Sequence, residues 1–302
     1  MDIQDKKRKK NKSIWYRMAA AVILLLLSAA LMILSAKAPA FAEWYSESIY
    51  PLAVNCIGRI CGLVPFSVSE VGIYILLTAF FVTLVRMVIK IAGYKERRRE
   101  SADSPARIFV SWISGVLLAA GILAFLYTAC CGINYHRSSF SEEEGIITYQ
   151  YGADDLKEIC VWLTEEVNAR ADEVARDGDG LLTLDESERD GGVEAMQQLS
   201  VEFSSLAGYY PKPKALILSE ILSYQGLTGI YLPFTVEANY NGDMPAYDKP
   251  FTVCHELSHL RGFMEEQEAN FIAFLACIGS DRTDFQYSGY LSGWVYCMNA
   301  LY

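Results

Sequence analysis

Three long apolar runs in the first half of the sequence restrict the fold more than any other feature. They cover residues 18–36, 68–92 and 108–133, and the first and third contain no charged side chain. Because a helix rises about 1.5 Å per residue, each run is long enough to cross about 30 Å of hydrocarbon. Hydrophobic residues make up 52% of the chain, which is high for a soluble protein. We therefore expect three transmembrane helices and contact with a lipid bilayer.

Basic residues flank these runs unevenly. They are concentrated in a tail of residues 1–17 and around the loop of residues 93–107, whereas residues 37–67 contain only Lys37 and Arg59. The positive-inside rule places such basic segments in the cytoplasm. The sequence thus predicts a multi-pass protein of the cell membrane with a cytoplasmic tail, a membrane domain of residues 18–133 and an extracytoplasmic domain of residues 134–302.

A cleavable signal peptide is the alternative for the first run. Ala38 and Ala40, or Ala40 and Ala42, have the small-x-small spacing that signal peptidase reads. An apolar run of 19 residues is longer than the usual signal peptide and favours an uncleaved anchor. Both alternatives leave the C-terminal domain on the same side of the membrane.

Charge and cysteine usage exclude several classes of protein. The net charge is −10, and the basic residues lie beside apolar runs, so we expect no nucleic-acid partner. The eight cysteines include no CxxC pair, which argues against a disulfide-stapled miniprotein or a cysteine zinc ribbon. A transporter is disfavoured because three spans supply no pair of broken helices.

Hydrophobic spacing gives a coarse plan for residues 134–302. Helical periodicity predicts four helices, and β-prone runs predict two strands. The helices are at 154–176, 193–206, 248–262 and 265–279, and the strands are at 215–218 and 230–236. Helices, a short sheet and then two more helices form an α+β pattern.

The motif that carries chemistry is HExxH, at residues 255–259. Residues i and i+4 lie on one face of a helix, so His255 and His259 can bind one Zn²⁺ ion. Glu256 then lies beside the metal-bound water, where it can act as the general base. The alternative is that both histidines are ordinary helix residues whose ring nitrogens are hydrogen-bonded within the protein.

A catalytic zinc ion needs a third protein ligand and an open position for water. Glu268 is our prediction, because it borders the apolar face of the helix that begins near residue 265. Glu265 is the second choice. Glu265 and Glu266 lie in the first turn of that helix, where their charges can serve the helix dipole and solvent.

An alternating stretch precedes the motif, with Ile230, Leu232, Phe234 and Val236 on one face. Pro233 cannot donate to a strand ladder, so we expect this strand at the edge of its sheet. An edge strand beside a zinc helix can hold an extended peptide by strand addition. An ordinary edge strand blunted by proline fits the sequence equally well.

Several short motifs resemble the bacterial domain-of-unknown-function family 3810. The similarity is closest over residues 210–279, in the segments 210–214, 223–224, 229–231, 233–235, 237–239, 255–259, 261–263 and 268–271. Members of this family are membrane proteins regarded as zinc metallopeptidases of the gluzincin type. The resemblance implies a zinc-dependent membrane peptidase with the ligands His255, His259 and Glu268, and it names no substrate. Larger gluzincins often carry an acid four residues after the ligand glutamate, but that position here is Ile272.

The fold class that we expect is therefore three transmembrane helices followed by an α+β gluzincin-like HExxH zinc domain. We expect it to hydrolyse peptide or protein substrates with Zn²⁺ as cofactor. The oxyanion donor could be Tyr287, Tyr290 or Tyr296. The rival hypothesis is a non-catalytic, zinc-stabilised membrane sensor or scaffold, which a fourth protein ligand would favour.

Overall fold

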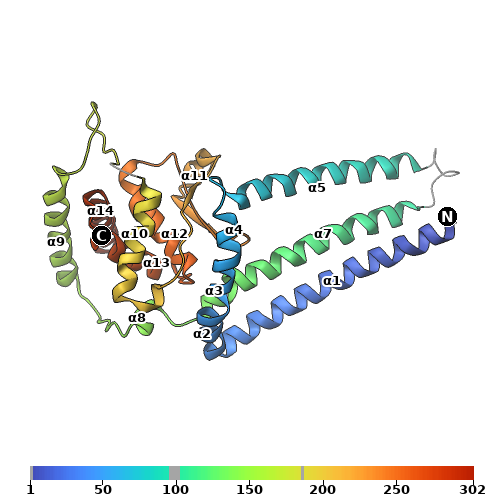
Figure 1. Ribbon diagram of the computed structural model, residues 1–302, viewed down its shortest axis with the longest axis horizontal. Helices are drawn as coiled ribbons and strands as arrows, with labels where there is room; N and C mark the ends of the chain where they lie inside the picture. Colours follow the sequence, from blue (N-terminus) through green and yellow to red (C-terminus); the bar gives the residue numbers. More distant parts are fainter. Residues whose placement is uncertain (1–2, 95–102, 185–186) are drawn as a thin grey trace.

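The computed structural model describes residues 3–94, 103–184 and 187–302. Three long helices, α1 (Ile3–Lys37), α5 (Val68–Ala92) and α7 (Pro105–Tyr127), extend from a domain that holds most of the other elements (Figure 1). All three are long and apolar enough to cross a membrane, which confirms the three predicted apolar helices. Most of the predicted 93–107 loop, residues 95–102, lies outside the described residues.

The long helices alternate in direction. The N-terminal ends of α1 and α7 and the C-terminal end of α5 lie far from the domain (Figure 1). The basic ends named above are thus at the opposite end of the helices from the domain. Helices α1 and α7 pack closely, since a Cβ added to Gly121 of α7 would lie 3.1 Å from the Ala21 carbonyl oxygen of α1.

A segment between α1 and α5 crosses the domain side of the long helices (Figure 1). It consists of α2 (Pro39–Ser48), α3 (Tyr50–Ala53), the π-helix η1 (Val54–Gly58) and α4 (Arg59–Cys61). Its buried residues include Ser46, Tyr50, Val54 and Gly58, which recur every four positions and form one helical face. Tyr50 and Val54 belong to the main hydrophobic core, so residues before position 134 also help to build the domain.

The domain is mostly helical, with one small sheet. Its helices are α8 (Phe140–Glu143), α9 (Ala153–Ala171), α10 (Glu188–Glu202), α11 (Ser219–Gln225), α12 (Lys249–Leu260), α13 (Glu266–Ile278) and α14 (Thr283–Leu301). The strand order is β1 (Lys214–Ala215), β3 (Glu237–Tyr240) and β2 (Gly229–Leu232), with β1 parallel and β2 antiparallel to β3. Helix α12 contacts both β2 and β3. Each of the four predicted helices has a counterpart, whereas the sequence analysis does not predict α8, α11 or α14.

The predicted strand at 230–236 is wrong in its second half. Strand β2 ends at Leu232, a turn occupies residues 233–236, and β3 then runs back beside β2. Pro233 has no amide hydrogen for a ladder, and Val236 has a φ of 53°, which an extended strand does not allow. Because β2 pairs only with β3, it does lie at the edge of the sheet, as expected.

Candidate metal centre

Helix α12 presents both histidines of the HExxH motif on one face. Proline at position 250 lies in the first turn, and Gly262, with a φ of +95°, follows the end of the helix. The imidazole rings of His255 and His259 have centroids 4.6 Å apart. Their side chains are only 13% and 9% exposed, so the protein around them fixes their orientation.

Hydrogen bonds define which ring nitrogen of each histidine is free. His255 Nδ1 lies 2.8 Å from Asn270 Oδ1, and His259 Nδ1 lies 2.8 Å from the Phe263 carbonyl oxygen. Both partner oxygens only accept hydrogen bonds, so each Nδ1 carries the proton and donates it. In the neutral form of each ring the lone pair is therefore on Nε2, which is the arrangement that a metal ligand requires.

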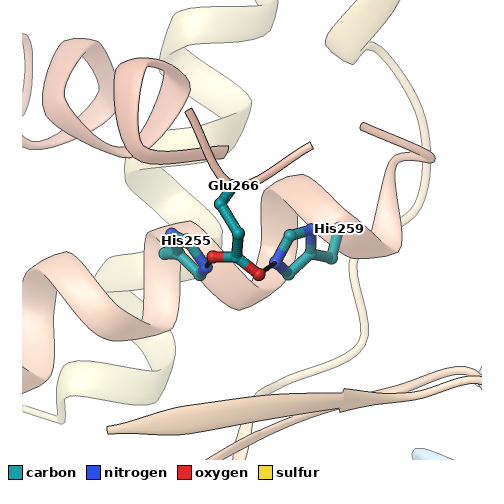
Figure 2. A group of neighbouring side chains, drawn as sticks. All are labelled: His255, His259 and Glu266. Atoms are coloured by element: carbon teal, nitrogen blue, oxygen red, sulfur yellow. Dashed lines mark ion pairs between the residues drawn. The ribbon is translucent and has the colours of Figure 1, made fainter. Parts of the chain in front are cut away.

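Glu266, at the start of α13, offers the third candidate ligand atom. Its carboxylate lies between the two imidazoles (Figure 2), with oxygens 3.3 Å from His255 Nε2 and 3.7 Å from His259 Nε2. One ligand atom from each of these three residues lies within 4.8 Å of the others. Among the residues that the structure describes, this group contains no fourth histidine, cysteine or carboxylate.

The structure does not bring Glu268 to the two histidines. Its Oε2 accepts a hydrogen bond of 2.8 Å from the Phe140 amide, at the start of α8. Residues two apart on a helix point in nearly opposite directions, so Glu266 and Glu268 of α13 cannot both face α12. Glu265, the second choice, is the N-cap residue of α13 and is exposed. The geometry therefore favours Glu266 as the third candidate ligand, in place of the predicted Glu268.

Asn270 connects His255 to Tyr296, a residue of α14. Its Oδ1 accepts from His255 Nδ1 and also from the Tyr296 hydroxyl, at 3.2 Å. Asn270 is four residues after Glu266, so both side chains lie on one face of α13. Counting from Glu266 rather than Glu268 would have identified this partner in the sequence.

Only one of the three candidate tyrosines lines the same pocket as the histidines, and it is Tyr296. Tyr290 packs edge-on against Trp162 and Phe274, and the Arg170 guanidinium lies 4.3 Å from its ring centroid. Neither Tyr287 nor Tyr290 is among the pocket-lining residues. The geometry therefore leaves Tyr296 as the candidate oxyanion donor.

The Glu256 carboxylate is buried beside the candidate ligands. The residue is 3% exposed, and its Oε2 has no hydrogen-bond partner among the described residues. Burial raises the pKa of Glu256 to about 8, although the charge of His255 lowers it. An unpaired buried carboxylate is costly, so its presence here points to a function.

The charges around the two histidines separate their proton affinities. Burial alone would lower the pKa of His255, but the hydrogen bond that its protonated ring donates to Glu266 and the charge of Glu256 raise it overall. Burial and the charge of His255 lower the pKa of His259 to about 4. The hydrogen bond with His255 in turn lowers the pKa of Glu266. His259 is thus neutral at pH 7, in the form that binds metals.

The donor set fits a zinc ion. Two histidine Nε2 atoms and one carboxylate oxygen are the ligands of many catalytic zinc sites, which leave a further position open. A pocket of about 830 Å³ opens beside them. Its walls include Gly229, Ile230 and Tyr231 of β2, Tyr247, Phe251, Asn270, Val295 and Tyr296, together with Cys131 and Tyr135 from the extension of α7.

The structure defines a protein with three membrane-length helices and a mostly helical domain that contains a candidate metal centre. The chain belongs to the family described as protein of unknown function (DUF3810), whose model matches residues 45–302. The match extends the resemblance from residues 210–279 to the crossing segment, α5, α7 and the whole domain. No curated protein and no solved structure matches the chain significantly.

Proposed function

We propose that this chain is a membrane-anchored, zinc-dependent peptidase that hydrolyses peptide bonds on the extracytoplasmic side of a bacterial cell membrane. The observation that carries the proposal is the meeting of His255, His259 and Glu266 beside the unpaired carboxylate of Glu256 (Figure 2). Asn270, four residues after Glu266, also occupies the position where larger gluzincins often carry an acid.

Zinc held by His255, His259 and Glu266 would lower the pKa of a bound water and polarise the substrate carbonyl. Glu256 takes the proton from the attacking water and passes it to the leaving amine. Its buried Oε2 has no competing partner among the described residues, which leaves it available for this transfer. The Tyr296 hydroxyl donates to Asn270 in this structure, and turning its single hydrogen into the pocket would let it donate to the developing oxyanion instead.

The edge of strand β2 supplies a place for the substrate backbone. Gly229, Ile230 and Tyr231 line the pocket, and β2 has a strand partner on one side only. An extended peptide can pair with the other side of β2 by strand addition. This docking would place a peptide bond next to Glu256, because Gly229 packs directly against that residue.

The rival hypothesis is a scaffold in which zinc only joins α12 to α13. The three-ligand set and the adjacent pocket favour the peptidase, since structural zinc sites usually have four protein ligands. The two hypotheses differ in what they require of Glu256, which a scaffold does not need.

The test compares the full-length wild type with Glu256→Gln in native membranes. We expect equal expression and zinc content, and loss of wild-type-dependent new N-termini among surface proteins. Losing a general base costs about 10²- to 10⁴-fold in rate. Glu265→Gln, an exposed carboxylate outside the ligand group, is the matched control and should behave like the wild type. Unchanged proteolysis in Glu256→Gln would favour the scaffold.

A further inference from the structure

The pocket lies at the domain-side end of the third long helix. Helix α7 continues through a π-helical turn, η2 (Thr128–Gly132), into a 3₁₀ turn, η3 (Ile133–His136). Cys131 of η2 and Tyr135 of η3 both line the pocket. The apolar run that begins in α7 ends at residue 133, so Tyr135 is within one helical turn, about 5.4 Å, of the end of the apolar segment.

Two tyrosines tie the elements around this pocket to η2 and to the crossing segment. The Tyr231 hydroxyl of β2 donates to the Cys130 carbonyl oxygen of η2, at 3.0 Å. The Tyr50 hydroxyl of the crossing segment donates to the Leu260 carbonyl oxygen of α12, at 2.9 Å. Both tyrosines are buried, which protects these hydrogen bonds from water. The edge strand and the metal-site helix are therefore each tied to a membrane-adjacent element.

The start of α5 is tied to the sheet in the same way. The Glu237 carboxylate of β3 accepts from the Val68 amide at 3.2 Å and from the Ser69 amide at 2.9 Å. The Glu70 carboxylate of α5 accepts from the Ile217 and Leu218 amides, at 2.8 and 2.9 Å. These contacts fix the domain against the N-terminal turn of a second long helix.

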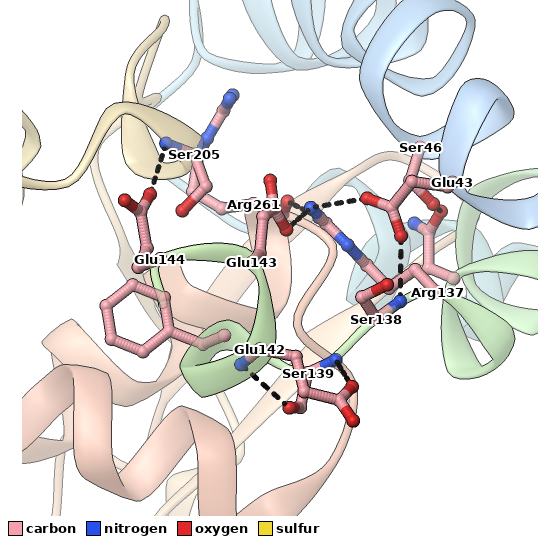
Figure 3. A network of polar contacts seen from close by, with 12 residues as sticks. Glu43, Ser46, Arg137, Ser138, Ser139, Glu142, Glu143, Glu144, Ser205 and Arg261 are labelled. Atoms are coloured by element: carbon pink, nitrogen blue, oxygen red, sulfur yellow. Dashed lines mark hydrogen bonds and ion pairs between the residues drawn. The ribbon is translucent and has the colours of Figure 1, made fainter. Parts of the chain in front are cut away.

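A third attachment joins α2 to the loop after η3 (Figure 3). The Glu43 carboxylate accepts from the Ser138 amide at 2.8 Å, and the Arg137 guanidinium pairs with Glu143. Arg137 also donates to the Arg261 carbonyl oxygen, at 3.2 Å, just after α12. With attachments at α2, α5 and α7, the metal centre is held at one height above the long helices.

The rim of the pocket has the chemistry of a bilayer surface. Tyr135, Leu227 and Tyr247 line it and are 43%, 44% and 38% exposed. Tyr224, on α11 next to α5, is 93% exposed. Tyrosine is enriched where a membrane meets water, so these exposed side chains suit the surface of a bilayer.

We infer that the substrate is a polypeptide anchored in the same membrane, cut within the few residues that emerge from the bilayer. The inference rests on the proposed peptidase function. A chain anchored beside α7 presents its first residues at the height of the pocket, and confinement to one membrane raises its effective concentration. Because the site is fixed within about one helical turn of the apolar segment, it cannot reach parts of a substrate that lie far from the membrane. Ten extended residues span about 33 Å, which sets the range of allowed cleavage positions.

The first experiment maps the surface N-termini that depend on Glu256, by comparing the full-length wild type with Glu256→Gln in cells. The inference expects them within about ten residues of a transmembrane segment or lipid anchor. N-termini in secreted proteins, or in domains far from the membrane, would overturn it while leaving the peptidase intact. If no N-terminus depends on Glu256, the proposed function fails and this inference fails with it.

The second experiment uses a cleaved segment identified in this way, in its natural anchored protein. A proline-rich spacer of twelve residues, about 37 Å long, is inserted between the anchor and the cleavage sequence. Cleavage should fall at least about tenfold, in line with the loss of effective concentration. The same spacer on the far side of the cleavage sequence is the control and should leave the rate unchanged. Equal cleavage with the spacer in either place would overturn the inference.

Discussion

The backbone of Gly229 lies directly against the side chain of Glu256. A Cβ added to Gly229 would lie 2.8 Å from Glu256 Cγ and 2.9 Å from its Cδ, well inside normal contact. Strand β2 therefore fixes the position of the proposed general base, and only glycine leaves room for it. The close approach also explains how an edge strand can bring a bound peptide next to a buried carboxylate.

We predict that Gly229→Ala lowers peptidase activity more than it lowers zinc content. The added methyl group must displace the Glu256 carboxylate or the strand, and misplacing a catalytic group by about 1 Å can cost 10²-fold in rate. Gln225→Ala, at a nearby exposed position that does not line the pocket, is the control. Peptidase assays and metal analysis on the same membranes check this. Wild-type activity in Gly229→Ala would contradict the role given to Glu256.

Replacing Glu266 and Glu268 should separate metal binding from folding. Glu266→Ala removes a proposed ligand, so zinc affinity should fall by more than the 10- to 100-fold typical of residues that only orient ligands. Glu268→Ala should keep zinc but lose the hydrogen bond from the Phe140 amide, at a cost of about 1–3 kcal/mol in unfolding free energy. Zinc content and thermal unfolding distinguish them, and the reverse pattern would restore Glu268 as the ligand.

Asn270 should orient His255 without binding the metal itself. Asn270→Ala removes the acceptor of the His255 Nδ1 hydrogen, so zinc affinity should fall about 10- to 100-fold. Asn270→Asp keeps an acceptor oxygen and should retain zinc. Titration with a competing chelator measures both variants. Equal zinc affinity in Asn270→Ala and the wild type would show that His255 needs no such partner.

Zinc binding at pH 7 should release a proton from Glu256. Its pKa of about 8 in the metal-free protein means that the carboxyl is mostly protonated at pH 7. A nearby dication favours the charged form and expels this proton. Calorimetry in two buffers of different ionisation enthalpy should find about one proton fewer for Glu256→Gln than for the wild type. Equal proton release would show that Glu256 is already ionised.

Parts of this architecture follow from local sequence, and other parts do not. Apolar length alone indicates α1, α5 and α7, and the spacing of His255 and His259 indicates their shared face. The third ligand depends on the residue at which α13 begins, because one helical position turns a side chain by about 100°. The apolar face of α13 points into the core, whereas the metal centre meets its first turn. The apolar face of α13 therefore points to Glu268 in the sequence, whereas the geometry points to Glu266.

The elements that were missed are short or depend on distant contacts. The helices of residues 39–61 are too short to show a clear period, and their buried face is completed by the domain that follows much later in the chain. The turn after β2 was hidden because Phe234 and Val236 continue the alternation of the strand. Pro233 is the local signal for that turn, because a proline that cannot donate to a ladder is compatible with the end of a strand as well as with an edge strand.

The buried ion pair of Lys214 and Glu237 should control how firmly the domain is attached to α5. Their side chains are 2% and 3% exposed, and Glu237 also accepts from the first amides of α5. Glu237→Gln leaves the Lys214 ammonium buried without its counter-charge, which costs about 3–5 kcal/mol in comparable pairs. Replacing both, as Lys214→Met with Glu237→Gln, removes that unpaired charge and should recover part of the loss. Thermal unfolding in lipid nanodiscs measures both variants. The control is Lys157→Met in the exposed pair Lys157–Asp154, which should change little because exposed pairs contribute about 0–1 kcal/mol. A double variant no more stable than Glu237→Gln alone would show that the amides of α5, rather than the charge of Lys214, are what Glu237 stabilises.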